Sequence, residues 1–447
     1  MSQRSLLLFL VALLIVGFTR PTVEAAPGSL QFLYTATPEY EPLAWLQGAD
    51  RFPRGAQIFV HGDAGQHPLV PSFAASADAA LSFDSQRVLF AGKQKPLDHW
   101  QIWELSLPDG TPRRVASGAD DCIRPLYLPE DRLVFTCRVG GRFEIRSAPL
   151  SGGKSLPLTY GAENAIPTDV LRDGRILFES AYGANHPEIY TVYSDGSGIE
   201  SYRCDHDSAR HGGRQVSSGD IIFVSGSALA KFTSARAKQV SVAMPTGEYL
   251  GEIAETSSGD WLFPWRAAQG QPYQLMLRKS NDARLYSVAR EPEANFVEPV
   301  VIAERAIPNR HPSGLHDWPN ANLLCLNAYT SKYKFAAGAI HSVKVYTRDP
   351  AGAAKLLGEA PVEGDGSFFV QVPSDQPIQM ELLDAAGKTL KRESGFFWAR
   401  RGEQRVCVGC HSGPETSPEN AVPMTLLKST TPADLTGAHA DGTSGGH

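Results

Sequence analysis

A strand-like pentapeptide recurs along the first two thirds of this 447-residue chain and limits the folds open to it. Each copy places two turn-forming or polar residues before three apolar ones, the last of which is phenylalanine. The copies occupy residues 86–90, 131–135, 174–178, 219–223 and 259–263. Their first apolar residues, Val88, Leu133, Ile176, Ile221 and Trp261, are separated by 45, 43, 45 and 40 positions. A spacing this regular indicates a repeated structural unit.

Reverse turns recur at a matching interval. The dipeptides at 109–110, 152–153 and 195–196 are Asp-Gly, Gly-Gly and Asp-Gly, and they lie 43 residues apart each time. Turns of this composition join antiparallel strands, and alternating segments such as 101–105 and 188–192 precede them. A period in the low forties with about four short strands predicts a β-propeller over residues 30–307. The segments 57–60 and 300–303 are expected to complete a sixth blade; a β-sandwich with accidental spacing is the alternative.

A smaller all-β unit is expected at residues 322–398, after a proline-containing linker. Residues alternate between apolar and polar at 342–346, 367–372 and 378–384, and glycine-containing turns occupy 364–366 and 385–387. The fold class predicted for the whole chain is therefore all-β, with a propeller followed by a small β-sandwich. A cofactor attachment segment at 399–428 and a disordered tail at 429–447, rich in Gly, Ser, Thr and Ala, are expected to follow.

The motif Cys-x-x-Cys-His at residues 407–411 is the attachment signature of a c-type haem. Two thiols three residues apart can each form a thioether with one vinyl group of the porphyrin. His411 is then positioned to supply an axial nitrogen to the iron, and the small Gly409 is expected to let the backbone approach the ring. The predicted site residues are Cys407, Cys410 and His411, and the β-sandwich together with the aromatic run 396–398 is expected to wall the haem. A structural disulfide, half of a zinc site and a thioredoxin-like pair are the alternatives.

The first 25 residues have the features of a secretory signal peptide. Arg4 precedes an apolar run at residues 6–18, and a small-x-small cleavage site occupies 23–25. We therefore expect a periplasmic or otherwise exported protein with no membrane span in the mature chain. The net charge is −6 and no long basic run is present, which excludes nucleic acid as an expected partner.

The remaining cysteines permit further bonds. Cys122 and Cys137 flank an expected strand pair, and a disulfide between them is plausible in an oxidising compartment. Cys204 and Cys325 can pair or remain free, since spacing alone does not decide.

The order of these parts resembles a known family. The propeller repeat is similar to the TolB type, and the run 361–384 resembles the carboxypeptidase-regulatory type of sandwich. Nearly the whole mature chain, and most strongly residues 323–423, resembles the N-terminal and middle portions of the hydrazine synthase alpha subunit. The segments carrying this last resemblance are Gly-Glu-Ala-Pro-Val-Glu-Gly-Asp-Gly-Ser-Phe at 358–368 and Gly-Glu-Gln-Arg-Val-Cys-Val-Gly-Cys-His at 402–411. The resemblance implies one covalent haem c in the domain after the propeller.

Two departures make hydrazine synthesis improbable here. The hydrazine synthase subunit continues into a further haem-bearing domain, whereas only 36 residues follow His411. Its haem in this domain also takes a tyrosine shortly after the motif as an iron ligand, and no tyrosine follows Tyr346 in this chain. His411 is therefore expected to take the ordinary proximal role.

The sixth iron ligand and the function remain open from the sequence. Met424, one of the histidines at 311, 316 and 341, or an open site are the alternatives for the iron. A polar cluster of Asp205, His206 and His211 is a candidate for acid–base or metal chemistry, although such clusters are usually solvated loops between blades. The functions considered are electron transfer to a redox partner, an oxidoreductase acting on a small molecule, and a binding propeller with structural haem.

Overall fold

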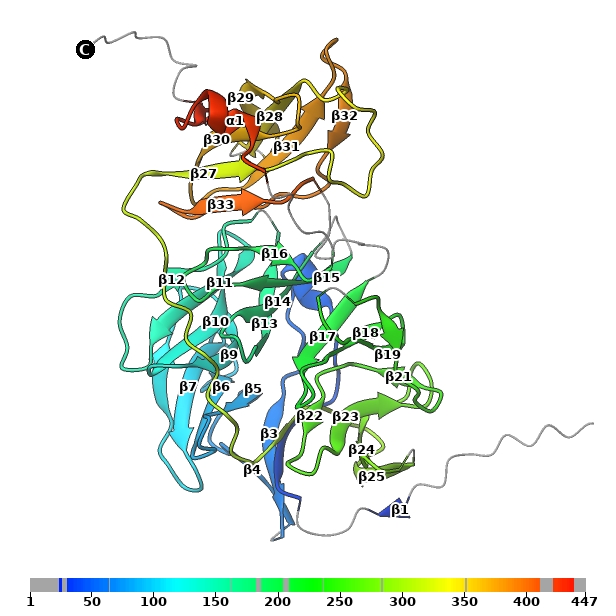
Figure 1. The fold of residues 1–447 in the computed structure, drawn as a ribbon. Helices are drawn as coiled ribbons and strands as arrows, with labels where there is room; N and C mark the ends of the chain where they lie inside the picture. Colours follow the sequence, from blue (N-terminus) through cyan, green and yellow to red (C-terminus); the bar gives the residue numbers. More distant parts are fainter. Residues whose placement is uncertain are drawn as a thin grey trace, which may run out of the picture.

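The computed structural model describes residues 24–25, 30–63, 65–161, 163–181, 186–203, 209–235, 237–282, 284–349, 352–410 and 421–437. Over these ranges the chain is almost entirely β-structure, in a larger and a smaller unit (Figure 1). None of the described helices has the length and apolar character needed to cross a membrane. The predicted signal peptide falls almost wholly outside the described residues.

The described strands of the larger unit form six sheets, which are the blades of a propeller. Blade 1 joins both ends of the unit in the order β26 (Asn295–Val301), β2 (Phe32–Thr37), β3 (Gln57–Gly62) and β4 (Gly65–Pro68), with the 3-10 helix η1 (Ala44–Gln47) between β2 and β3. Blade 2 contains β5 (Ala75–Leu81), β6 (Arg87–Lys93), β7 (Gln101–Ser106) and β8 (Arg113–Ala116). Blade 3 contains β9 (Cys122–Leu128), β10 (Arg132–Val139), β11 (Arg142–Pro149) and β12 (Leu156–Pro157).

Blades 4 to 6 continue the pattern in the described chain. Blade 4 contains β13 (Ala165–Val170), β14 (Ile176–Ala181), β15 (Pro187–Val192) and β16 (Glu200–Ser201). Blade 5 contains β17 (Arg210–Gln215), β18 (Ile221–Ser225), β19 (Ala228–Phe232) and β20 (Val240–Ser241). In blade 6, β21 (Glu248–Tyr249) and β22 (Ala254–Glu255) both pair with β23 (Trp261–Arg266), followed by β24 (Gln274–Arg278), β25 (Leu285–Ala289) and, in parallel, β1 (Glu24–Ala25).

The repeated pentapeptides occupy equivalent places, which confirms the predicted propeller. They form the second strand of blades 2 to 6, and the five residues used for the spacing lie on β6, β10, β14, β18 and β23. Segments 57–60 and 300–303 meet in blade 1, where β3 and the end of β26 flank β2. The second strands are apolar without alternation because neighbouring blades cover both of their faces. Val88, Leu89 and Phe90, for example, are completely buried.

The innermost strands are interrupted by a repeated kink. Asp78, Arg124, Gly212 and Glu298 each have positive φ at a point where the register of their strand shifts, and Glu252 has positive φ between β21 and β22. A β-bulge of this kind re-aims a side chain out of the sheet. The four charged residues in this set meet one another, and so they bring buried charge to the centre of the propeller.

Arg51, from the connection between β2 and β3, completes this buried charge network. Its two terminal nitrogens lie 2.5 Å from Asp78 and 2.6 Å from Glu298. Arg124 lies 3.3 Å from Asp78 and also pairs with Glu252. Burial opposes ionisation of Glu298, but the two arginines outweigh it and lower the pKa of its carboxyl to about 2. Blades 1, 2, 3 and 6 are thereby joined through ion pairs.

The smaller unit is a sandwich of two sheets in the part of the chain that is described. One sheet has the order β33 (Gln404–Cys407), β27 (Asn320–Cys325), β30 (Phe368–Pro373) and β34 (Ala433–Asp434). The other has the order β29 (Ala354–Pro361), β28 (Ser342–Arg348), β31 (Ile378–Leu383) and β32 (Thr389–Arg392). Along β28, Val343, Val345 and Thr347 face the core while their neighbours are half-exposed, as the alternation predicted.

Part of the expected tail belongs to this sandwich. β34 adds to β30 in parallel, and Leu435 is 2% exposed within the hydrophobic core. The burial of Leu435 and the pairing of β34 with the edge of β30 hold this segment on the sandwich. Its composition alone had predicted disorder. Residues 438–447 lie outside the described ranges.

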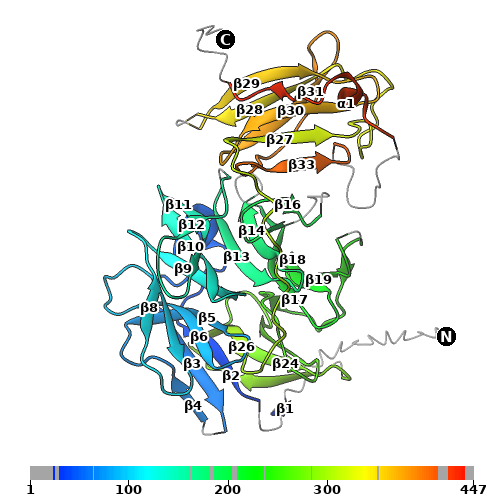
Figure 2. The same cartoon turned by 60° about the vertical axis from the view of Figure 1, so that its left-hand side comes forward.

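The sandwich packs over one end of blades 3 and 4 (Figure 1, Figure 2). Trp398 is 5% exposed in the hydrophobic core of these two blades, and its indole nitrogen donates to the backbone of Gly196 at 3.0 Å. Glu403 and Arg405 also hydrogen-bond to the backbone of the 195–199 turn of blade 4. These contacts fix the start of β33 relative to the propeller.

The carboxyl of Glu179 on β14 has a raised pKa, and its effect on stability can be tested. It accepts hydrogen bonds from the backbone amides of Gly212 and Gly213. Burial raises the pKa of Glu179 to about 7, against the opposing effect of Arg124. The folded protein therefore holds this proton at a pH where an unfolded glutamate has released it.

We predict that Glu179→Gln removes part of the pH dependence of stability. Because the unfolded chain binds fewer protons between pH 4.5 and 7, the wild-type free energy of unfolding falls as pH rises through this interval. Glutamine keeps the acceptor oxygen and does not ionise, so the free energy of unfolding of the variant should exceed that of wild type at pH 8 by about 3 kcal/mol. Urea unfolding at pH 5, 6, 7 and 8 measures this difference. Parallel pH profiles for the two proteins would contradict the prediction.

Candidate cofactor attachment site

The predicted thiols lie at the end of an edge strand. Cys407 is the last residue of β33, which pairs in parallel with β27 so that Cys407 lies opposite Cys325. The carbonyl of Cys407 accepts a hydrogen bond from the amide of Leu326 at 2.9 Å, which extends the ladder by one step. The backbone position of Cys407 is therefore set by the sandwich core.

The turn between the two cysteines packs closely on a neighbouring loop. A Cβ atom at Gly409 would lie 2.0 Å from the carbonyl oxygen of Thr330 and 2.8 Å from that of Asn327. From the sequence we expected this glycine to admit a macrocycle. The structure supplies another reason for it, because loop 327–330 occupies the space that a side chain would need.

Cys407 and Cys410 are both partly buried, and neither forms a disulfide with another described cysteine. Burial raises the pKa of the Cys407 thiol to about 11, so this sulfur is protonated at neutral pH. A nucleophilic cysteine instead needs a stabilised thiolate. The environment of Cys407 therefore disfavours the thioredoxin-like alternative.

Cys325, which the sequence left unassigned, is part of this site. It is 2% exposed and lies within hydrogen-bonding distance of the Cys410 thiol. That hydrogen bond, together with burial, raises the pKa of Cys325 well above its usual value. Its possible partner Cys204 falls outside the described residues, as does the proposed iron ligand His411.

Met424 begins the short helix α1 (Met424–Lys428), which is attached to the start of β30. The amide of Met424 donates to Asp365 at 2.7 Å, and the amide of Thr425 donates to Ser367 at 3.0 Å. Lys428 pairs with Glu363 at the other end of the helix. In the sheet register Phe368 lies opposite Cys325, which lies opposite Cys407, so α1 is held at the thiol end of the sheet, two strands away from Cys407.

The other iron-ligand candidates are not gathered around the thiols. His311 stacks on Tyr193 of blade 4 with ring centroids 3.8 Å apart, and His316 stacks on Trp318 at 4.9 Å. His341 lies directly before β28, where its amide donates to Leu383. The aromatic run 396–398, which we expected to wall the cofactor, also makes contacts away from the thiols. Its tryptophan fills the core of blades 3 and 4, because the domain junction needs an apolar anchor.

The expected polar cluster falls only partly within the described chain. Asp205 and His206 lie outside it, whereas His211 lies on β17. Burial lowers the pKa of His211 to about 4, against the opposing effect of Glu252. His211 is therefore neutral at physiological pH.

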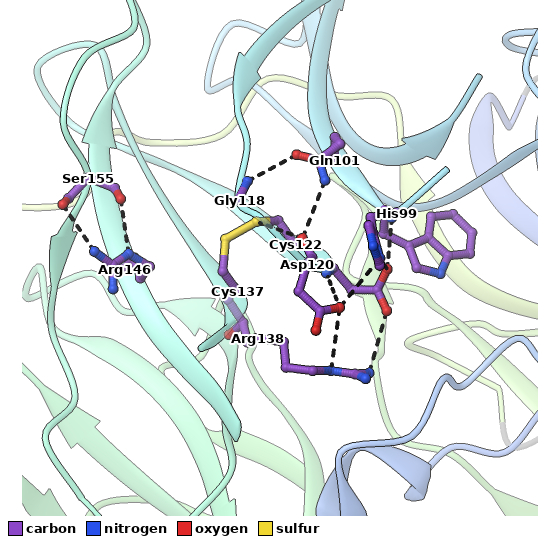
Figure 3. Close-up of a disulfide and its surroundings, with 12 residues drawn as sticks. His99, Gln101, Gly118, Asp120, Cys122, Cys137, Arg138, Arg146 and Ser155 are labelled. Atoms are coloured by element: carbon purple, nitrogen blue, oxygen red, sulfur yellow. Dashed lines mark hydrogen bonds and ion pairs between the residues drawn. A yellow bond between two sulfur atoms is a disulfide. The ribbon is translucent and has the colours of Figure 1, made fainter. Parts of the chain in front are cut away.

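A second group of titratable side chains surrounds the disulfide between Cys122 and Cys137, whose formation the sequence left open (Figure 3). His99 lies 3.4 Å from Asp120 and 3.4 Å from Asp121, and Arg138 approaches both carboxylates from the other side. Within the described residues this is the group that brings three metal-ligand side chains together. Because Arg138 pairs with both carboxylates, we interpret this group as a set of polar contacts that holds the chain beside the disulfide.

Comparison with known protein families gives a match within the smaller unit. Residues 326–412 match the family described as the hydrazine synthase alpha subunit middle domain. Over these residues the chain is similar to that middle domain. The matched region contains β28 to β33 in full, together with both thiols of the motif, and begins directly after β27. The resemblance predicted for residues 323–423 is thereby confirmed.

Most of the chain has the fold of solved structures. It aligns with Kuenenia stuttgartiensis hydrazine synthase at a TM-score of 0.78 and 16% identity, covering 90% of this chain and 72% of that chain. TolB from Acinetobacter baumannii aligns at a TM-score of 0.47 and 16% identity, covering 63% of this chain and 68% of that one. No curated protein matches the sequence.

Gly409→Ala tests how tightly the thiol turn is packed in the middle domain. The added methyl group would overlap two carbonyl oxygens of loop 327–330, so the turn or the loop must move. We expect a loss of about 1–3 kcal/mol in the stability of the middle domain, as in other overpacked sites. Thermal unfolding of the unloaded protein measures the loss, with Val406→Ala at an exposed strand position as the matched control. Equal midpoints for the two variants would contradict the expected overlap.

Proposed function

We propose that this chain is an exported protein that carries one covalent haem c. Cys407 and Cys410 are the thioether residues, and His411 is the proximal iron ligand. The observation that carries the proposal is the pair of thiols, three residues apart and free of disulfides to described cysteines, at the end of an edge strand of the middle domain. A histidine follows the second thiol directly in the sequence.

The donor set fits this cofactor. Thioether formation requires reduced sulfur, and neither Cys407 nor Cys410 forms a disulfide with a described cysteine. β33 pairs with the central strand β27, so the backbone position from which the Cys407 side chain extends is fixed by the sandwich. Arg405, two residues earlier, ties the same strand to the propeller through the carbonyl of Ile199 at 3.2 Å. The bound haem would supply reversible one-electron transfer between ferric and ferrous iron.

Export is supported by two independent features. The first 25 residues have the sequence pattern of a cleaved signal, and Cys122 and Cys137 form a disulfide between the first two strands of blade 3. Structural disulfides persist in oxidising compartments such as the bacterial periplasm. The proposed role is electron transfer to a periplasmic redox partner, and a small-molecule substrate at an open iron site is the alternative.

The first test is covalent attachment. When the chain is exported from cells with a working haem maturation system, its intact mass should exceed that of the processed polypeptide by one haem. Cys410→Ala should lose the two-thioether adduct because only one sulfur remains to bond. Protein from cells without the maturation system is the control. A mass equal to that of the bare polypeptide under maturation conditions would refute the proposal.

The second test separates electron transfer from small-molecule chemistry. We predict that the ferrous protein binds carbon monoxide with a shifted Soret band and that Met424→Ala leaves this spectrum nearly unchanged. The reason is that α1 is fastened to β30 through Asp365 and Ser367, and moving it across a ring would break these contacts. A sharp six-coordinate spectrum that is indifferent to carbon monoxide would contradict this prediction and favour plain electron transfer.

A further inference from the structure

We propose that Cys325 is the third thiol of the attachment site and forms a disulfide with Cys410 when no haem is attached. The disulfide would be a covalent modification of the unloaded protein that withholds one of the two thioether sulfurs. Its existence depends only on the arrangement of the cysteines. Its role as a guard of the attachment site rests on the proposed function.

The first support is the position of Cys325. It ends β27 in the centre of the sheet, directly opposite Cys407, and its side chain is 2% exposed. Its thiol hydrogen-bonds with the thiol of Cys410, and the backbone of Asn327 also contacts the sulfur. Two thiols in hydrogen-bonding contact can form a disulfide when side-chain rotation closes the remaining distance.

The second support is the packing that keeps Cys410 there. Cys410 is partly buried against the same hydrophobic core to which Cys325 belongs. The Gly409 backbone is pressed against loop 327–330, whose chain continues directly from Cys325 through Leu326. The turn therefore carries Cys410 back over the end of β27 rather than away from the sandwich.

Metal binding does not account for this cluster as well as a disulfide does. The three sulfurs do not converge into a metal-binding group within the described chain, where such a group is found only at His99, Asp120 and Asp121. Oxidation requires only the two contacting thiols, Cys325 and Cys410.

The reaction balances with an oxidant of a stated class. Cys325 and Cys410 lose two protons and two electrons as their S–S bond forms, and the disulfide of a thiol–disulfide oxidoreductase is reduced to a dithiol. The Cys122–Cys137 disulfide indicates that the folded chain meets such an oxidant. Before haem attachment the reverse exchange with a reduced dithiol must return Cys410 to its thiol form. Cys325 is then left as a buried free thiol.

The test uses the full chain exported with and without haem maturation. Acid quenching, alkylation under denaturing conditions and tryptic digestion without reductant place Cys325 in peptide 311–332 and both motif cysteines in peptide 406–428. In unloaded protein we expect these two peptides to be joined and Cys325 to escape alkylation. In haem-loaded protein we expect the join to be lost and Cys325 to be alkylated.

Two matched variants identify the partner. In unloaded Cys407→Ser the joined peptides should persist, whereas in unloaded Cys410→Ser they should be lost and Cys325 should be alkylated. The Cys122–Cys137 linkage in the same digests verifies that each variant has folded. A bond within peptide 406–428, a bond from Cys325 to Cys407 or Cys204, or alkylation of all three thiols would overturn the inference. Failure to load haem would instead count against the proposed function and leave the digest of unloaded protein unaffected.

Discussion

The closed propeller depends on buried charges that meet at its centre. Arg51 and Arg124 are shared among Asp78, Glu252 and Glu298, and all five side chains are nearly inaccessible to solvent. Removing one partner from such a network leaves a charge without compensation, which typically costs about 3–5 kcal/mol. Because these residues come from both ends of the propeller sequence, the network can form only when blade 1 has closed.

Glu298 shows how chain closure and the charge network reinforce each other. It lies on β26, the last strand of the propeller, which pairs with β2 near the start of the chain. Its carboxylate also accepts hydrogen bonds from Thr35 on β2 and from the amide of Asp78 on β5. One side chain therefore joins the closing strand to the strand beside it and to the next blade. The ladder hydrogen bonds of β26 and the ion pairs of Glu298 select the same register.

The sequence predicted those parts of the fold that repeat or alternate. The 40- to 45-residue spacing located the second strand of five blades, and alternation located the sandwich strands. The central charges were not predictable, because each inner strand contributes one bulged residue and those residues are scattered from Asp78 to Glu298. Trp398 was placed in the wrong environment for a related reason, since an aromatic run does not show which domain buries it. Its partner at Gly196 is about two hundred residues earlier in the chain.

At the proposed attachment site, too, residues that are close in sequence were predictable and a residue that is distant in sequence was not. Spacing alone predicted Cys407, Cys410 and His411 as site residues, whereas Cys325 is brought to the two described thiols of the motif only through the parallel pairing of β27 with β33. Parallel strands require a long connection, and here that connection is most of the sandwich itself. The position of the thiol end of β33 therefore depends on the sandwich core formed by the chain between residues 325 and 404. A cofactor attached at this site would meet sulfur atoms whose backbone positions are already fixed, unlike those in a motif on an isolated flexible segment. This physical difference explains why a β-sandwich can present such a motif without the helices that usually surround it.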